Sequence, residues 1–193
     1  MKPSYSGFEA KKANNFVDLP PVGAYVAEIK KAQFVPGENG FRDKIECYLE
    51  ITEGEYAGRF TEVWNDQTEK FGQAAYKGIF NLIPYVDGDE DWRKRAFEGN
   101  LWCVQQSNPG YAWDWHEEKL VGKKVGINLR KRLYTYNGKD RETVEIAQFE
   151  TVDDVKNGKC KILNPRDRRQ KSEESTDGSE FTDVSKDVSV PWG

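Results

Sequence analysis

The segment from residue 122 to residue 149 constrains the fold more than any other part of the chain. Two runs of alternating apolar and polar side chains, 123–136 and 142–149, flank a short linker that begins Asn137-Gly138. Alternation with a period of two is typical of β-strands, and Asn-Gly is the strongest short signal for a hairpin turn. The segment therefore predicts a two-stranded antiparallel hairpin.

Three strands and a helical region are expected before this hairpin. Residues 23–34, 41–51 and 59–64 have the composition of strands, and helical spacing of apolar residues predicts helices over 71–85 and 87–97, the second ending at Gly99. Residues 101–118 fit a loop, or a short strand followed by a loop. The resulting order, β-β-β-α-β-β, predicts a mainly β fold: a five-stranded barrel of the oligonucleotide-binding (OB) type with a helical insertion between strands 3 and 4.

The second of these strands has the clearest division into two faces. Its alternation predicts that one set of side chains points into the core, namely Phe41, Ile45, Cys47, Leu49 and Ile51. The other set is expected to point to solvent, namely Arg42, Lys44, Glu46, Tyr48 and Glu50. A strand of this kind has one buried face and one solvated face.

Composition divides the chain into three parts. Residues 1–15 are polar and are expected to form a flexible N-terminal arm, residues 16–165 form one domain, and residues 166–193 form a disordered acidic tail. Residues 172–193 hold six acids and one base, a net charge of −5, so the rest of the chain carries +1 of the whole-chain −4. The tail ends in Val190, Pro191 and Trp192, apolar groups that we expect to recruit partner proteins.

The hairpin concentrates positive charge in this acidic protein. Between residues 119 and 141 there are eight bases and one acid. In strand register, Arg130, Arg132, Tyr134 and Tyr136 share one face with Asn128, so guanidinium groups alternate with aromatic rings. Single-stranded nucleic acid is bound by this combination, because cations contact phosphates and rings stack on bases of any identity. A solvated strand face made soluble by arginine is the alternative reading.

Other basic and aromatic residues extend this expected DNA-binding site. The supporting contacts are assigned to Lys123, Lys124, Lys131, Arg42, Lys44 and Tyr48. Trp113 and Trp115 either stack on bases or pack against one end of the barrel, and the sequence leaves both readings open.

No pattern in the chain points to catalysis. It has one histidine, no Walker loop and no nucleophile elbow, and its three cysteines have no zinc or redox spacing. We therefore expect no catalytic residue, no metal and no cofactor. No apolar run is long enough to span a bilayer, which predicts a soluble intracellular protein with unpaired thiols.

Three short motifs together resemble a known family. They are Leu-Val-Gly-Lys-Lys-Val-Gly at 120–126, Glu-Gly-Glu-Tyr-Ala-Gly-Arg at 53–59 and Asp-Asp-Val-Lys-Asn-Gly-Lys at 153–159. The chain resembles a bacteriophage-encoded family of single-stranded-DNA-binding proteins, first catalogued as a domain of unknown function, over roughly residues 16–164. The resemblance implies an OB fold, no catalysis, a role in phage DNA replication or recombination, and the cytoplasm of the infected bacterial host.

The tail is also similar in design to that of bacterial single-strand-binding proteins, which ends in acids, proline and a terminal phenylalanine. Here Pro191-Trp192 takes that place, and Gly193 follows it. The resemblance implies replication or recombination proteins, of the host or of the phage, as partners of the tail.

Two other functions remain open from the sequence. One is a protein-interaction adaptor built on a β-barrel without nucleic-acid binding, favoured by the near-neutral charge of residues 1–171. The other is a metal-dependent nuclease, whose carboxylates would be scattered in the sequence.

Overall fold

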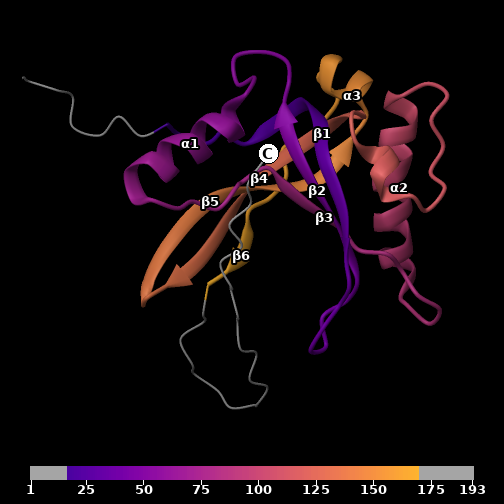
Figure 1. The fold of residues 1–193 in the computed structure, drawn as a ribbon, viewed down its shortest axis with the longest axis horizontal. Coiled ribbons are helices and arrows are strands. Elements are labelled where there is room, and N and C mark those ends of the chain that lie inside the picture. Colours follow the sequence, from indigo (N-terminus) through magenta and orange to yellow (C-terminus); the bar gives the residue numbers. More distant parts are fainter. Residues whose placement is uncertain (1–16, 170–193) are drawn as a thin grey trace, which may run out of the picture.

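A computed structural model describes residues 17–169, so the predicted arm at 1–15 and the tail beyond residue 169 lie outside the described residues. The described chain is mainly β, as predicted. It forms β1 (Gly23–Val35), β2 (Lys44–Ile51), α1 (Arg59–Phe71), β3 (Ile79–Leu82), α2 (Asp91–Ser107), a 3₁₀ turn (Glu117–Leu120), β4 (Lys124–Tyr136), β5 (Lys139–Glu150), α3 (Val152–Lys156) and β6 (Arg166–Arg168). Figure 1 shows α2 and the tip of the β4–β5 hairpin on opposite sides of the molecule.

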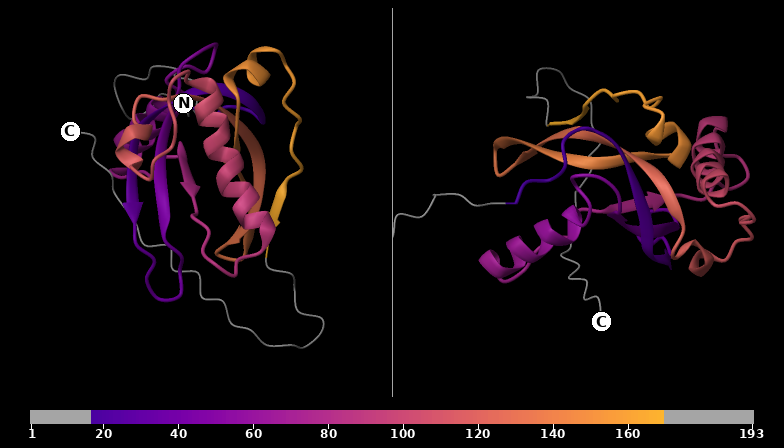
Figure 2. Two further views of the ribbon diagram at one scale, coloured as in Figure 1. Left: turned by 90° about the vertical axis from the view of Figure 1, so that its right-hand side faces the viewer. Right: turned by 90° about the horizontal axis from the view of Figure 1, so that it is seen from above.

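The strands form one open sheet of six strands, whereas a five-stranded OB-type barrel was expected. Their order is β3-β2-β1-β4-β5, and β6 pairs in parallel with β4. The sheet curls strongly (Figure 2), so that Phe80 of β3 packs on Phe149 of β5 with ring centroids 4.6 Å apart. No β3–β5 ladder joins these two strands within residues 17–169.

The predicted hairpin is confirmed, with a tighter turn. β4 and β5 pair continuously from Tyr136–Lys139 to Gly126–Glu150, with one irregularity next to Asn128. Asn137 and Gly138 alone form the turn, with φ angles of 50° and 69°. Two consecutive positive φ angles define a type I′ turn, whose twist matches that of the strands and which Asn-Gly adopts readily.

Residues 59–64, predicted as the third strand, begin helix α1 instead. Phe60 and Val63 are three residues apart, so they lie on one helical face, and both are buried. A contact from outside the segment favours the helix. The buried Glu50 carboxylate accepts hydrogen bonds from the backbone N–H groups of Phe60 (3.1 Å) and Thr61 (2.7 Å) in the first turn, where a negative charge stabilises a helix.

The helix predicted over 71–85 is also wrong, because this segment contains β3. Gly72 ends α1 with a φ of 77°, and Gly78 lies against β2, where a Cβ would be 2.3 Å from the Leu49 carbonyl oxygen. The following four residues pair with β2 in the register Cys47–Phe80 and Ile45–Leu82. The third strand along the chain is therefore β3, and the helices and strands follow one another in the order β-β-α-β-α-β-β-α-β.

Helix α2 begins later and ends later than predicted. It continues through Gly99 because Phe97, Leu101 and Val104 form a buried stripe on one face. Burial of that stripe outweighs the cost of about 1 kcal/mol that glycine imposes on a helix interior. Residues 101–107 of the segment expected as a loop are thus helical, and α2 lies between β3 and β4 along the chain.

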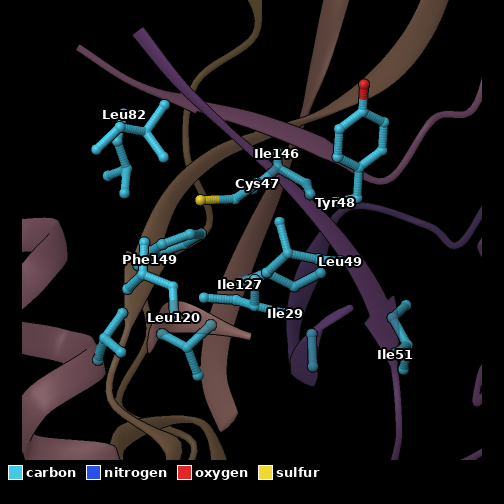
Figure 3. Close-up of a cluster of buried hydrophobic side chains, with 14 of the residues drawn as sticks. Ile29, Cys47, Tyr48, Leu49, Ile51, Leu82, Leu120, Ile127, Ile146 and Phe149 are labelled. Carbon is cyan, nitrogen blue, oxygen red and sulfur yellow. The ribbon is translucent and has the colours of Figure 1, made fainter. Parts of the chain in front are cut away.

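The core lies inside the curled sheet. Figure 3 shows side chains from β1, β2, β4 and β5 converging, among them Ile29, Leu49, Ile127 and Phe149. The predicted inward residues of β2 are buried except Phe41, which precedes the strand and is 62% exposed. The expected outward orientation is wrong for Tyr48 and Glu50, which are 1% and 8% exposed because the α1–β3 region covers that end of β2.

Residues 166–168, expected as the start of the tail, form the short strand β6. It runs parallel to β4 with Arg132 opposite Arg166 and Tyr134 opposite Arg168. β1 pairs with β4 only as far as Leu129, so β6 pairs with the part of β4 that extends beyond β1.

Candidate nucleic-acid interface

The two faces of the β4–β5 arm differ sharply in charge. Residues directly opposite each other in a strand pair point to the same face. One face, which we call the arginine face, carries Arg130, Arg132, Tyr134, Tyr136, Lys139, Arg141, Thr143, Glu145, Arg166 and Arg168. It holds six bases and one acid, a net charge of +5.

The opposite face of the arm is acidic. It carries Lys131, Leu133, Thr135, Asp140, Glu142, Val144 and Asp167. Arg169 joins Lys131 on this face, because its guanidinium is 2.5 Å from Asp167 and 3.7 Å from Asp140. Two bases against three acids give −1. Lys131, an expected DNA contact, lies on this face and its Nζ is 3.1 Å from Glu142. Alternation in β4 thus separates Lys131 from its neighbours Arg130 and Arg132.

Three arginines surround the single acid of the arginine face. The Glu145 carboxylate is 2.9 Å from Arg130, 4.0 Å from Arg132 Nε and 3.8 Å from Arg166. Only the first distance is that of a strong ion pair. The Nε of Arg132 is buried without a hydrogen-bond partner among the described residues. One carboxylate therefore compensates three guanidinium groups incompletely.

The electrostatics of the neighbouring groups reflect this excess of positive charge. Burial lowers the pKa of Arg166, and the charges of Arg168, Arg130 and Arg132 lower it further, while Glu145 acts in the opposite direction. Burial and the charge of Arg132 likewise lower the pKa of Lys77, which precedes β3. An anion placed here would relieve repulsion among these cations.

Two tyrosines extend the arginine face toward the tip of the hairpin. Tyr136 is 61% exposed, and the Arg132 guanidinium lies 5.5 Å from the Tyr134 ring centroid. Both rings point to the face that carries the arginines, as the alternation predicted. The face thus offers cations for phosphates beside rings for bases.

Three predicted DNA contacts in and just before β2 have other partners: Arg42, Lys44 and Tyr48. Arg42 donates two hydrogen bonds to the Asp89 carboxylate, at 2.7 and 2.6 Å, and Lys44 pairs with Glu46 at 2.7 Å. The buried Tyr48 ring has no surface left for stacking, and its hydroxyl donates to Glu46 at 3.2 Å.

Lys123 and Lys124 lie at the start of β4, at the other end of the strand from the arginine face. Eight residues separate Lys124 from Arg132, about 26 Å at the rise of a strand. Lys124 pairs with Glu53 at 3.6 Å, and the Lys123 ammonium lies 4.9 Å from the Tyr111 ring centroid. Neither is near the arginine cluster.

Trp113 and Trp115 lie against α2, since the Trp113 backbone N–H donates to Gln105 and the Trp115 ring stacks on Phe97. Helix α2 itself is on the side of the molecule away from the hairpin tip (Figure 1). Trp113 is half-buried and packs on the core. Trp115 stacks on Phe97 with centroids 5.8 Å apart and remains 62% exposed. Of the two alternatives for Trp113, the structure has the one in which the side chain packs against the end of the sheet.

The sequence analysis missed residues that lie on or beside the arginine face but are distant from Arg130 and Arg132 in the sequence. Arg166 and Arg168 were assigned to the tail, and Glu145 and Lys77 were given no role. The alternation Arg-Asp-Arg at 166–168 is a strand pattern, although three residues are too few to distinguish it from a charged loop. Only the pairing with β4 reveals its place.

No protein-family model and no curated protein matches this chain. No helix among residues 17–169 is long and apolar enough to cross a membrane. Over the same residues, no group of three or more histidine, cysteine or acidic side chains is arranged to hold a metal ion. All three cysteines are free thiols, and burial raises the pKa of Cys47 to about 12. The predicted partner-binding residues Val190, Pro191 and Trp192 lie outside the described residues.

Proposed function

We propose that this protein binds single-stranded DNA without sequence preference through the arginine face of the β4–β5 arm. The observation that carries the proposal is the separation of charge across the arm, +5 on one face and −1 on the other. A hairpin made soluble by arginine alone has no need to collect its cations on one face. Guanidinium groups bind phosphates strongly, often through two parallel hydrogen bonds.

Tyrosines on the same face favour single strands over duplex. Rings stack only on bases that are unpaired and accessible, and each base–aromatic stack contributes about 1–3 kcal/mol. Tyr136 is exposed at the hairpin tip, and Tyr134 lies beside Arg132. Duplex DNA offers the phosphates but hides the bases.

The strand order supports an OB-type barrel as part of the proposal. OB folds are partly open barrels that bind oligonucleotides with the face of strands 2 and 3 and with the loops joining strands 1–2 and 4–5. Here the sheet is open between β3 and β5, a helix separates strands 3 and 4, and the arginine face lies on the arm that joins strands 4 and 5. The wider role in phage replication or recombination, with the tail recruiting partners, rests on the family resemblance.

Fluorescence titration with oligo-dT of about 20–30 nucleotides tests the proposal. Quenching of tyrosine and tryptophan emission by the single strand, and little change with duplex DNA, is the expected result. With about four to six phosphate contacts, log K should fall with log salt at a slope of roughly −3 to −4. No binding, or affinity that does not depend on salt, would refute it.

A matched pair of variants locates the site. Arg132→Ala should weaken binding about tenfold or more and reduce the salt slope by about 1. Lys131→Ala removes the same charge from the adjacent residue, on the acidic face, and should leave affinity within about twofold. Equal losses in the two variants would indicate binding by net charge rather than by this face.

A second candidate, a protein-interaction adaptor, is favoured by exposed tryptophans away from the arm. Trp102 is 53% exposed and Trp115 is 62% exposed, both on or against α2. If oligo-dT leaves the fluorescence unchanged, the adaptor becomes the better reading. Loss of partner binding in Trp115→Ala would then support it.

A further inference from the structure

A cleft of about 420 Å³ lies where the sheet is open, between β3, the first turns of α2, and β5. Its volume falls within the range of about 300–1,000 Å³ typical of small-molecule sites. Leu82, Ile83, Phe80 and Phe97 supply apolar walls, whereas Arg93 and Arg166 supply positive charge. The cleft is thus suited to a flat, partly apolar group attached to an anion.

One residue connects this cleft to the arginine face. Arg166 lines the cleft, and its guanidinium is also 3.8 Å from Glu145 in the arginine cluster. A chain of phosphates lying on Arg130 and Arg132 and continuing past Arg166 therefore arrives at the mouth of the cleft. The two sites form one positively charged path rather than two separate patches.

Trp92 gives the cleft a surface for stacking. Its side chain, in the first turn of α2, lines the cleft and remains 51% exposed. The Arg93 guanidinium lies 4.5 Å from the Trp92 ring centroid, and the indole N–H donates to Glu90. These two contacts hold the ring at the edge of the cleft beside a cation that can contact a phosphate.

We infer that this cleft receives one unpaired base of the strand bound on the arginine face, stacked on Trp92 with its phosphate near Arg93 and Arg166. The inference rests on the proposed function and deepens it by giving the strand a path from the hairpin arm to the α2 side of the sheet. Two arginines at the mouth disfavour a purely apolar ligand, and the connection through Arg166 favours a polyanion over a single small anion.

Binding of an oligo-dT series from about 4 to about 16 nucleotides, the range of site sizes of single OB domains, tests the inference. Wild-type affinity should rise when the strand becomes long enough to reach the cleft. Trp92→Ala should lose that rise, with affinity about 5- to 100-fold weaker for the longest strand, and should bind the shortest strand as wild type does. Trp102→Ala is the matched control, because Trp102 is equally exposed on the same helix, outside the cleft, and it should bind every length like wild type.

Photocrosslinking supplies a second readout that does not depend on a variant. A single 5-iodouracil moved along the 16-nucleotide strand should crosslink to Trp92 from one position, identified by peptide mass spectrometry. Two results would contradict base binding in the cleft without contradicting DNA binding on the arginine face. One is crosslinks confined to Tyr134 and Tyr136, and the other is a Trp92→Ala protein that binds all lengths normally. A wild-type protein that binds no strand of any length would instead overturn the proposed function, and the inference with it.

Discussion

Arg132 of β4 lies directly opposite Arg166 of β6 in a parallel strand pair, so two arginine side chains share one face of adjacent strands, and the charge of Arg132 lowers the pKa of Arg166. Like charges placed opposite each other destabilise a sheet. Glu145 offsets the repulsion only in part, since its carboxylate is 4.0 Å from one arginine and 3.8 Å from the other. The arrangement is costly for the free protein, and the phosphate of the DNA that we propose as ligand would offset this cost.

Removing the charge of Glu145 should therefore lower the stability of the fold and raise the affinity for DNA. In Glu145→Gln we expect the free energy of unfolding to fall by about 1.5–3 kcal/mol, because Arg130 loses its charged partner. We expect the affinity for oligo-dT to increase several-fold, because the net positive charge of the arginine face increases. Urea unfolding and fluorescence titration measure the two effects. Weaker DNA binding in this variant would mean that Glu145 chiefly positions Arg130, and that the excess of positive charge does not drive binding.

The acidic tail should compete with DNA for the arginine face. Deleting residues 172–193 removes a net charge of −5, and we expect several-fold tighter binding at low salt, with the difference disappearing as salt screens the charges. A full-length variant with the six acids replaced by their amides should behave like the deletion. Trp192→Ala keeps the charge and should bind DNA like wild type but lose partner proteins. An unchanged affinity in the deletion would exclude competition.

Asp89 should make stability depend on pH in the acid range. Hydrogen bonds from Arg42 and from the Val86 backbone hold the pKa of Asp89 below its ordinary value of 3.8. Since the folded-state pKa is depressed, the stabilisation is fully present above 3.8 and is lost as pH falls through the folded value. Asp89→Asn should thus be less stable than wild type at pH 5–7, and the difference should shrink below about pH 3.8.

The control for this experiment is Asp87→Asn, which removes the same charge from an exposed side chain two residues earlier. Thermal unfolding from pH 3 to pH 7 compares the three proteins. A difference between Asp89→Asn and wild type that stays constant across this range would show that the Arg42 contact does not stabilise the fold through charge.

Glu50 should be critical for α1. Its buried carboxylate accepts hydrogen bonds from the N–H groups of Phe60 and Thr61 and from the Tyr76 hydroxyl. Glu50→Gln places an amide donor among these donors, and we expect a loss of about 2–3 kcal/mol in urea unfolding. Glu62→Gln, an exposed change in the first turn of the same helix, should cost less than about 1 kcal/mol. Equal losses would assign the effect to helix charge in general.

The features that the sequence predicted correctly are those specified by neighbouring residues. Alternation alone placed Arg130, Arg132, Tyr134 and Tyr136 on one face, and Asn137-Gly138 set the turn between the strands. Strand β1 was predicted to within one residue for the same reason. Local periodicity is decisive where a strand has one buried and one exposed face.

The features that the sequence could not predict depend on distant contacts. Residues 59–64 fit a strand or a helix, and the choice depends on the Glu50 carboxylate at the helix start. Residues 79–82 become a strand because Gly78 allows the backbone to approach Leu49. The place of Arg166 depends on a parallel pairing with β4, more than thirty residues earlier in the chain, and no local pattern encodes such a partner.

The short strand β6 also affects the tendency of this protein to self-associate. β4 continues beyond the last residue paired with β1, and an uncovered strand edge is a template on which a second molecule can add its own strand. β6 occupies part of that edge with three exposed charged residues, Arg-Asp-Arg. Charged side chains on an edge strand disfavour pairing with a strand of another molecule. The residues that we propose to hold DNA would then also keep concentrated protein from assembling edge to edge.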